Sequence, residues 1–185
     1  VQVQEFGKVV LLGRKVLLVV EDDTASETAD NLSQCMHTML DKVTRDVWDA
    51  SVPQISCLNG SNGNAITELS QIDINRAIQY LDDNDTEKMT PTVEGNFRFG
   101  TGPVESGFWV TAHVNLKGDI RAIDAFVPTS QYGSQEPVLQ AEFGSIDESR
   151  WVTSTLVKVS SANPPVYNNT FVGANAYGYI GIDQV

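Results

Sequence analysis

The chain has 185 residues, 41% hydrophobic and 19% charged, a composition typical of a folded body rather than a disordered segment. Twelve lysines and arginines stand against 24 aspartates and glutamates, so the formal charge is −12. Because nucleic-acid binding depends on cations that neutralise phosphates, this balance argues against a DNA-reading protein. No apolar run approaches the roughly 20 residues of a membrane helix, and we expect no membrane partner.

The acidity has two interpretations, an ordinary soluble surface or a surface that lies beside DNA without adhering to it, and charge alone does not separate them. The first residues lack the basic leader and small-residue cleavage site of a secretory signal. The chain opens with Val1 rather than Met, which indicates a processed or partial product. Cys35 and Cys57 are the only cysteines, and two reduced thiols favour assembly in the cytoplasm.

Residues 1–20 are strand-like. The first four residues alternate valine and glutamine, and the following apolar run is interrupted only by Gly13, Arg14 and Lys15, which we expect to form a turn. A single domain would have to cover both faces of this run, whereas an extended arm would be covered by a neighbouring subunit. We therefore assign residues 1–22 to an extended β arm or loop.

The clearest predicted element is a long helix within residues 23–51. Thr24 and Glu27 fit a capping box, and Asp22 and Asp23 favour the positive end of a helix. Apolar residues then recur at helical spacing: Ala25, Ala29, Leu32, Met36, Met39, Leu40, Val43 and Val47. With no Gly or Pro before Pro53, the pattern predicts about 26 residues, near 40 Å at 1.5 Å per residue. Such a helix would act as a strut.

A second capped helix is predicted from Ser70, after a turn-rich loop at residues 59–64. Asp73 stands three residues after the cap, and one face carries Ile74, Ala77, Ile78 and Leu81. The helix should end in the polar stretch of residues 82–85, and Pro91 enforces a stop.

Beyond residue 92 the pattern becomes β-rich. We predict strands at 108–114, 150–159 and 170–182, a short helix at 118–125 with Ile120 and Ile123 inward, and a loop-rich segment at 126–145. Small residues in the last strand indicate close approach of another backbone. Helices first and strands later predict an α+β fold, in which residues 52–185 form the body.

No residue is predicted to be catalytic, cofactor-binding or metal-ligating. His37 and His113 lack the spacing of a metal site, and we interpret both as structural histidines. The acidic clusters at 21–23 and 82–85 are explained by helix-end charge; the second lacks the glycine and distal glutamate of a calcium-binding loop. Residues 100–102 lack the GKS/T ending of a phosphate loop, and no serine lies in a GxSxG elbow. Four sequons, at Asn31, Asn59, Asn84 and Asn168, are compositional without a secretory signal.

Five stretches, in chain order, resemble the major capsid proteins of podophage-type tailed bacteriophages, which adopt the Hong Kong 97-type shell fold. They are residues 20–51, 66–91, 108–123, 143–155 and 167–183. In the first, the ending of the family's spine helix matches Thr38, Asp41, Thr44, Arg45, Asp46 and Val47. The pattern departs at Asn115, where the family often has a proline, and the family's N-terminal arm would lie upstream of Val1.

The resemblance implies a subunit that forms pentamers and hexamers of an icosahedral head, enclosing double-stranded DNA without specific binding. It implies peripheral and axial domains braced by the spine helix, and portal, scaffold and accessory head proteins as further partners. The product would be a virion component assembled in the host cytoplasm. Some phage shells are cross-linked by Lys–Asn isopeptide bonds. Lys8, Lys15, Asn168 and Asn169 have the required side chains, but nothing in their spacing indicates that they meet.

The leading hypothesis is therefore a structural capsid protein that is not an enzyme and needs no cofactor. The alternative is another virion or surface-assembly protein with a β-rich binding face. A third, an enzyme such as a hydrolase that uses carboxylates, rests only on the abundance of acidic residues. Oligomeric state distinguishes the first two, and a carboxyl group titrating near neutral pH would favour the third.

Overall fold

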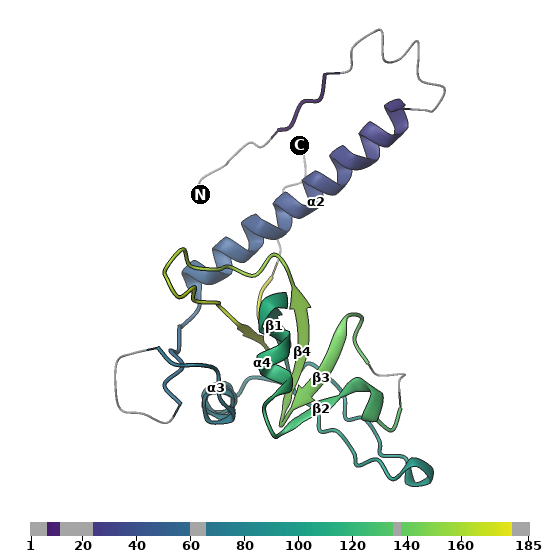
Figure 1. Cartoon of the computed structure of the whole chain (residues 1–185), viewed down its shortest axis with the longest axis vertical. Helices are drawn as coiled ribbons and strands as arrows, with labels where there is room; N and C mark the ends of the chain where they lie inside the picture. The colour runs from purple at the N-terminus through teal and green to yellow at the C-terminus, as the bar shows by residue number, and fades with distance from the viewer. Residues whose placement is uncertain (1–6, 12–23, 60–65, 135–137, 179–185) are drawn as a thin grey trace. The chain divides into compact units, whose positions relative to one another are not determined.

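The computed structural model describes residues 7–11, 24–59, 66–134 and 138–178 (Figure 1). The chain divides into two compact units, Val1–Val52 and Pro53–Val185. In the described residues, the first unit contains one long helix, and the second contains the shorter helices together with a five-stranded sheet. The predicted α+β class is confirmed.

The long helix, α2, spans Thr24–Ser51 and has 28 residues, as the apolar repeat predicts (Figure 1). Hydroxyl groups along it donate to carbonyl oxygens one turn earlier: Thr38 to Gln34 at 2.9 Å, Thr44 to Leu40 at 2.9 Å, and Ser51 to Val47 at 2.7 Å. These polar groups are thus satisfied within the helix itself. The Thr24 side chain of the predicted capping box lies outside the described residues.

The predicted β arm is not a strand where the structure describes it. Residues 7–11 have no regular secondary structure, while 1–6 and 12–23 lie outside the described ranges. A strand forms only when a second strand shares its hydrogen bonds. Among the residues described, no segment of the same chain pairs with 7–11. The apolar, β-branched character of this segment is therefore not satisfied by a ladder with the described residues.

The sheet of the second unit has the strand order β2-β3-β4-β1-β5. Its central pair, β1 and β4, is parallel, and the other neighbours are antiparallel. The β3–β4 connection is a tight turn in which Asp147 has a positive φ of 45°. The strands are β1 Phe108–His113, β2 Phe126–Pro128, β3 Glu142–Ile146, β4 Ser149–Ser154 and β5 Thr170–Val172.

In the described part of the second unit, two α-helices and three single-turn 3₁₀ helices accompany the sheet. Helix α3 begins as predicted after Ser70, whose hydroxyl accepts the Asp73 amide at 3.4 Å, and Asn84 is its C-cap. Helix α4 ends at Arg121, earlier than predicted, because the chain turns there to enter β2. The bounds are α3 Gln71–Asp83, α4 Lys117–Arg121, η1 Phe97–Phe99, η2 Val114–Leu116 and η3 Thr129–Gln131.

The main core lies between one face of the sheet and the helices α3 and α4. Strand β1 alternates buried and half-buried residues, so Phe108, Val110 and Ala112 point into this core. They meet Ile74 and Ile78 of α3, Ile120 of α4, and Trp151 of β4. Burying a large apolar side chain contributes about 1.5–3 kcal/mol, so these contacts fix α3 on the sheet. A second cluster contains Val93, Val104 and Tyr132.

Residues 126–145, predicted to be loop-rich, contain β2 and most of β3. The prediction was wrong because these strands lack an alternating apolar pattern: β2 ends in Pro128, and β3 contains Gly144 and the buried polar residues Glu142 and Ser145. Tertiary contacts of the polar side chains, rather than apolar periodicity, hold β3 in the sheet.

The two later strands are shorter than predicted. Strand β4 begins one residue early, at Ser149, and ends at Ser154, where the backbone turns. Strand β5 ends at Val172, and residues 173–178 are not a strand. The predicted close approach of a backbone is confirmed: a Cβ at Gly173 would lie 2.9 Å from the Glu87 carbonyl oxygen. The Ala174 amide donates to the same oxygen at 2.9 Å.

Candidate functional site

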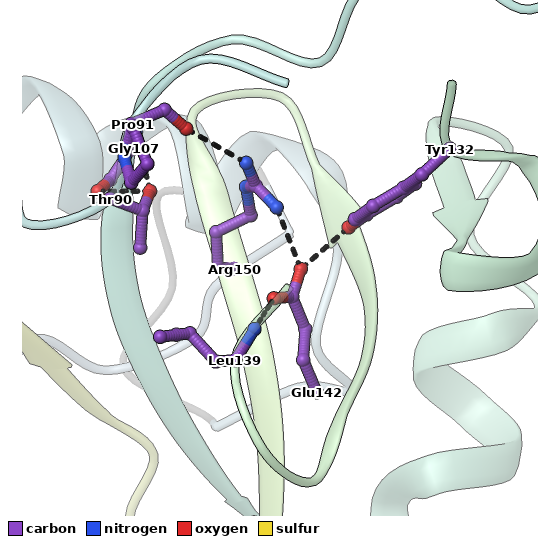
Figure 2. Close-up of polar contacts among 7 residues, drawn as sticks. All are labelled: Thr90, Pro91, Gly107, Tyr132, Leu139, Glu142 and Arg150. Atoms are coloured by element: carbon purple, nitrogen blue, oxygen red, sulfur yellow. Dashed lines mark hydrogen bonds and ion pairs between the residues drawn. The ribbon is translucent and has the colours of Figure 1, made fainter. Parts of the chain in front are cut away.

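A buried ion pair joins Arg150 of β4 to Glu142 of β3 (Figure 2). The Arg150 Nη1 atom lies 2.9 Å from Glu142 Oε1, and their side chains are 1% and 0% exposed. Neighbouring strand residues point to opposite sheet faces, so Arg150 leaves the face that Trp151 uses for the apolar core. Two charges without water are stable only when other groups complete their hydrogen bonding.

Three further contacts extend this ion pair into a network, which we call the Arg150 network; in the described part of the chain the buried Arg150 Nε has no hydrogen-bond partner. The Tyr132 hydroxyl donates to Glu142 Oε1 at 2.7 Å, and the Leu139 amide donates to Oε2 at 2.9 Å. Arg150 Nη2 donates to the Pro91 carbonyl oxygen at 3.0 Å. Figure 2 shows the carboxylate between the guanidinium and the phenol, which come from different segments. Burial raises the pKa of Tyr132 far above its usual value, and the neighbouring carboxylate adds to this.

The Arg150 network is suited to holding segments together rather than to chemistry. Both carboxylate oxygens of Glu142 are occupied by donors, and the guanidinium lies 5.2 Å from the centre of the Tyr132 ring. Next to it, the Thr90 hydroxyl donates to the Gly107 carbonyl at 2.9 Å and accepts the Gly107 amide at 3.0 Å (Figure 2). These contacts hold several segments to strand β4, namely those around residues 90, 107, 132, 139 and 142.

A second polar cluster surrounds Asp73 at the start of α3. Its carboxylate accepts the Leu58 amide at 2.9 Å, the Asn59 amide at 3.2 Å and the Ser70 hydroxyl at 2.7 Å. Burial alone raises the pKa of Asp73, but these hydrogen bonds outweigh it, and the net pKa lies below the ordinary value. The sequence predicted Asp73 near the helix cap but not the contacts to residues 58 and 59. The cluster anchors the chain before α3.

The turn after β1 gives Asn115 two specific partners. The Asn115 amide donates to His113 Nδ1 at 3.2 Å, and its Nδ2 donates to the Tyr167 hydroxyl at 3.1 Å. The His113 and Tyr167 rings lie 5.1 Å apart. A proline at 115 has no amide hydrogen and could not make the first contact. His113 thereby contributes contacts to both Asn115 and Tyr167 at this turn.

The remaining residues considered as site candidates lie on separate elements. His37 lies on α2 and His113 on β1, and the described residues contain no group of three potential metal ligands. Asp82 and Asp83 end α3, with Asn84 as its C-cap, and both are exposed. The C-terminal end of a helix is the negative end of its dipole, so the predicted pairing of this acidic cluster with helix-end charge is wrong. Gly100 has a left-handed φ of 63° that closes a 3₁₀ turn, and no helix opens there. Cys35 and Cys57 are free thiols.

A separate feature is the exposed apolar surface of helix α2. None of its residues whose exposure is described is buried. Met36 is 64% exposed, Leu40 51% and Val47 58%. At about 100° per residue these side chains fall on one face of the helix, together with Leu32 and Val43. We call this face the α2 stripe. A contiguous exposed apolar stripe of this kind is typical of a surface that binds another element.

No helix in the described part of the chain has the length and apolarity needed to cross a membrane. The sequence matches no model of a known protein family, and no curated protein matches it. The α+β fold and the geometry of the site are thus the observations from which a function is inferred.

Proposed function

We propose that this chain is a structural subunit that assembles with identical copies into a closed shell, and specifically a major capsid protein of a tailed bacteriophage with the Hong Kong 97-type fold. In this role it forms pentamers and hexamers of an icosahedral head that encloses double-stranded DNA. It is not an enzyme and uses no cofactor. Portal, scaffold and accessory head proteins are its further partners, and the virion is its location.

The observation that carries the proposal is the apolar face that α2 exposes in the described part of the chain. A helix in a globular protein draws most of its stability from packing of its apolar face rather than from intrinsic propensity. Here a 28-residue helix has no buried residue among those described, and its stripe exposes Met36, Leu40 and Val47. Burial of the stripe against other subunits would provide the missing packing, and a long straight helix would serve as the brace of a shell subunit.

The body supports a structural rather than a catalytic role. The charged side chains that are fully buried, Arg150 and Glu142, are used to hold strands and loops. Asp73, the other buried carboxylate, has a lowered pKa and accepts hydrogen bonds from the segment before α3. A general acid or base needs a pKa near the working pH, and the lowered pKa of Asp73 moves it away from that range.

The net charge suits a container for DNA. With a formal charge of −12, the subunit repels phosphates on average. A wall that bound the genome tightly would hinder its entry and release. The acidity is therefore consistent with enclosure without specific binding.

The test is the oligomeric state of the full chain. We expect size-exclusion chromatography with light scattering to show large assemblies, and negative-stain electron microscopy to show rings of five or six copies or closed shells. Met36→Ser/Leu40→Ser should reduce assembly, whereas Gln34→Ala, a polar change on the same helix outside the stripe, should not. A strictly monomeric chain at high concentration would contradict the proposal. A discrete small oligomer would favour the alternative of another virion or surface-assembly protein.

A further inference from the structure

A lysine and a cysteine from distant parts of the first unit are in direct contact. Lys8 Nζ lies 3.0 Å from Cys35 Sγ, although the two residues are 27 positions apart in the chain. Lys8 belongs to the described segment 7–11, Cys35 lies on α2, and both belong to the first compact unit. The contact is therefore made within one unit and joins the N-terminal segment to the helix.

The approach of this segment to α2 does not depend on the lysine alone. Val10 is 46% exposed, whereas its neighbours Val9 and Leu11 are 85% and 92% exposed. Lys8 and Val10 are two residues apart, the spacing at which side chains of a non-helical segment point to the same side. Both line one hollow with four residues of α2 at the spacing of a single helix face, namely Thr28, Asn31, Leu32 and Cys35.

The hollow gives small molecules access to the sulfur. Its volume is about 170 Å³, which is room for several molecules the size of water. Cys35 is half-buried and Lys8 is exposed, so the contact lies at the surface of the unit. A small oxidant can therefore reach the sulfur while the lysine nitrogen remains beside it.

The other cysteine, Cys57, has a different environment. Burial raises the pKa of its thiol, and the nearby carboxylate of Asp73 adds to this. The thiolate is the form of cysteine that attacks an oxidant, so these surroundings disfavour reaction at Cys57. Of the two free thiols, Cys35 is the one that combines access from solvent with an amine in contact.

We propose that Lys8 and Cys35 form a modification site, at which a peroxide oxidises the sulfur and the lysine amine then closes a covalent S–N bond. In the first step the sulfur attacks a peroxide oxygen, the O–O bond breaks, and a sulfenic acid and water form. In the second step the lone pair of Lys8 Nζ attacks Sγ, the S–O bond breaks, and the hydroxyl group leaves as water with a proton from the amine. Thiol, amine and hydrogen peroxide thus give a sulfenamide and two waters; the sulfur is oxidised and the peroxide is reduced.

The contact favours this outcome over further oxidation. An amine that already lies against the sulfur needs no encounter with it, so the second step has the advantage of an intramolecular reaction. The bond joins residue 8 to α2 and restrains the segment between them. A thiol reductant reverses it by attack on the sulfur. The reaction takes place within one copy, so it goes beyond the proposed self-assembly and does not depend on it.

The experiment treats the full chain carrying Cys57→Ser with hydrogen peroxide at mildly alkaline pH, which increases the fractions of thiolate and free amine. Intact mass is then measured after denaturation. We expect a monomer about 2 Da lighter, the mass of the two hydrogens lost when the S–N bond forms, and recovery of the original mass with dithiothreitol. Cys57→Ser excludes an internal disulfide, which gives the same mass change. A tryptic map should contain a peptide that joins the sequences around Lys8 and Cys35.

Matched lysine variants test the geometry. Lys8→Arg keeps the positive charge, but a guanidinium stays protonated and is not a nucleophile, so the cross-linked fraction should fall at least about tenfold. Lys42→Arg is the control, because Lys42 lies on α2 seven residues beyond Cys35 and should leave the reaction unchanged. Cys35→Ser should abolish it. Sulfenic or sulfinic acid at Cys35 without the lighter species would overturn the proposal, and so would an equal yield of that species in Lys8→Arg.

Discussion

Replacement of Arg150 by methionine is the sharpest test of the buried network. The guanidinium lies 2.9 Å from a carboxylate oxygen of Glu142, and both side chains are essentially without solvent contact. Methionine fills a similar volume but leaves the carboxylate with two neutral donors, the Tyr132 hydroxyl and the Leu139 amide. The Pro91 carbonyl also loses the hydrogen bond from Arg150 Nη2. The variant therefore contains a buried, uncompensated negative charge.

Removal of one partner from a buried ion pair costs about 3–5 kcal/mol in the free energy of unfolding. Glu142→Leu should cost a similar amount, because the guanidinium then keeps only the Pro91 carbonyl. In the double variant Arg150→Met/Glu142→Leu no charge remains, and the Tyr132 hydroxyl and Leu139 amide lose their acceptor. Unpaired neutral groups cost about 1–3 kcal/mol each, so the double variant should be far less destabilised than the two singles added together.

The assay is urea unfolding of the full chain at neutral pH, followed by tryptophan fluorescence and analysed by linear extrapolation. The control is Lys88→Met, which breaks the half-exposed pair between Lys88 and Glu148 at 2.7 Å and should cost no more than about 1 kcal/mol. The reasoning is refuted if Arg150→Met costs no more than this control, or if the two single costs simply add in the double variant.

Two pH dependences follow from the other buried groups. The pKa of Asp73 is lowered, so its contribution to stability is present above the ordinary value of 3.8 and is lost as pH falls through the lowered value. Asp73→Asn should therefore lower the free energy of unfolding by about 1–2 kcal/mol at pH 6 and by less at pH 3. An equal difference between wild type and variant at both pH values in urea titrations would contradict this. The pKa of Tyr132 is raised from 10.0, so its contribution is complete below that value and is lost as pH rises above it. The stability gap between wild type and Tyr132→Phe should therefore narrow in alkaline urea titrations, and a constant gap from pH 8 to 11 would exclude the proposed cause.

The helices were predictable because their signals are local. The start of α3 depends on Ser70 and Asp73, which are three residues apart, and α2 depends on an apolar repeat uninterrupted by glycine or proline. The residue that begins β1, Phe108, was likewise predicted from a run of apolar and β-branched residues. Capping and periodicity act within a few residues, so a single sequence contains the information needed to place these elements.

The strands β2 and β3 and the Arg150 network were not predictable in the same way. Arg150 meets Glu142 eight residues away and Pro91 fifty-nine residues away. Nothing in the pattern around Glu142 distinguishes it from an exposed acidic residue, because its burial depends on donors from Tyr132 and Leu139. Polar residues in strands lower the apolar signal even when they are fully buried. The exposed Phe97 was missed for the converse reason, since an apolar residue between glycines indicates burial as readily as exposure.

The buried network and the loop of residues 95–101 are physically linked. Arg150 holds the Pro91 carbonyl, and two residues later Val93 begins the bridge to Val104 that forms the base of this loop. Tyr132 donates to Glu142 and also packs against Val93, so the same side chain belongs to the network and to the cluster at the base of the loop. Loss of the ion pair therefore acts on this loop as well as on the strands, because the Pro91 carbonyl and the Tyr132 hydroxyl each depend on one member of the pair.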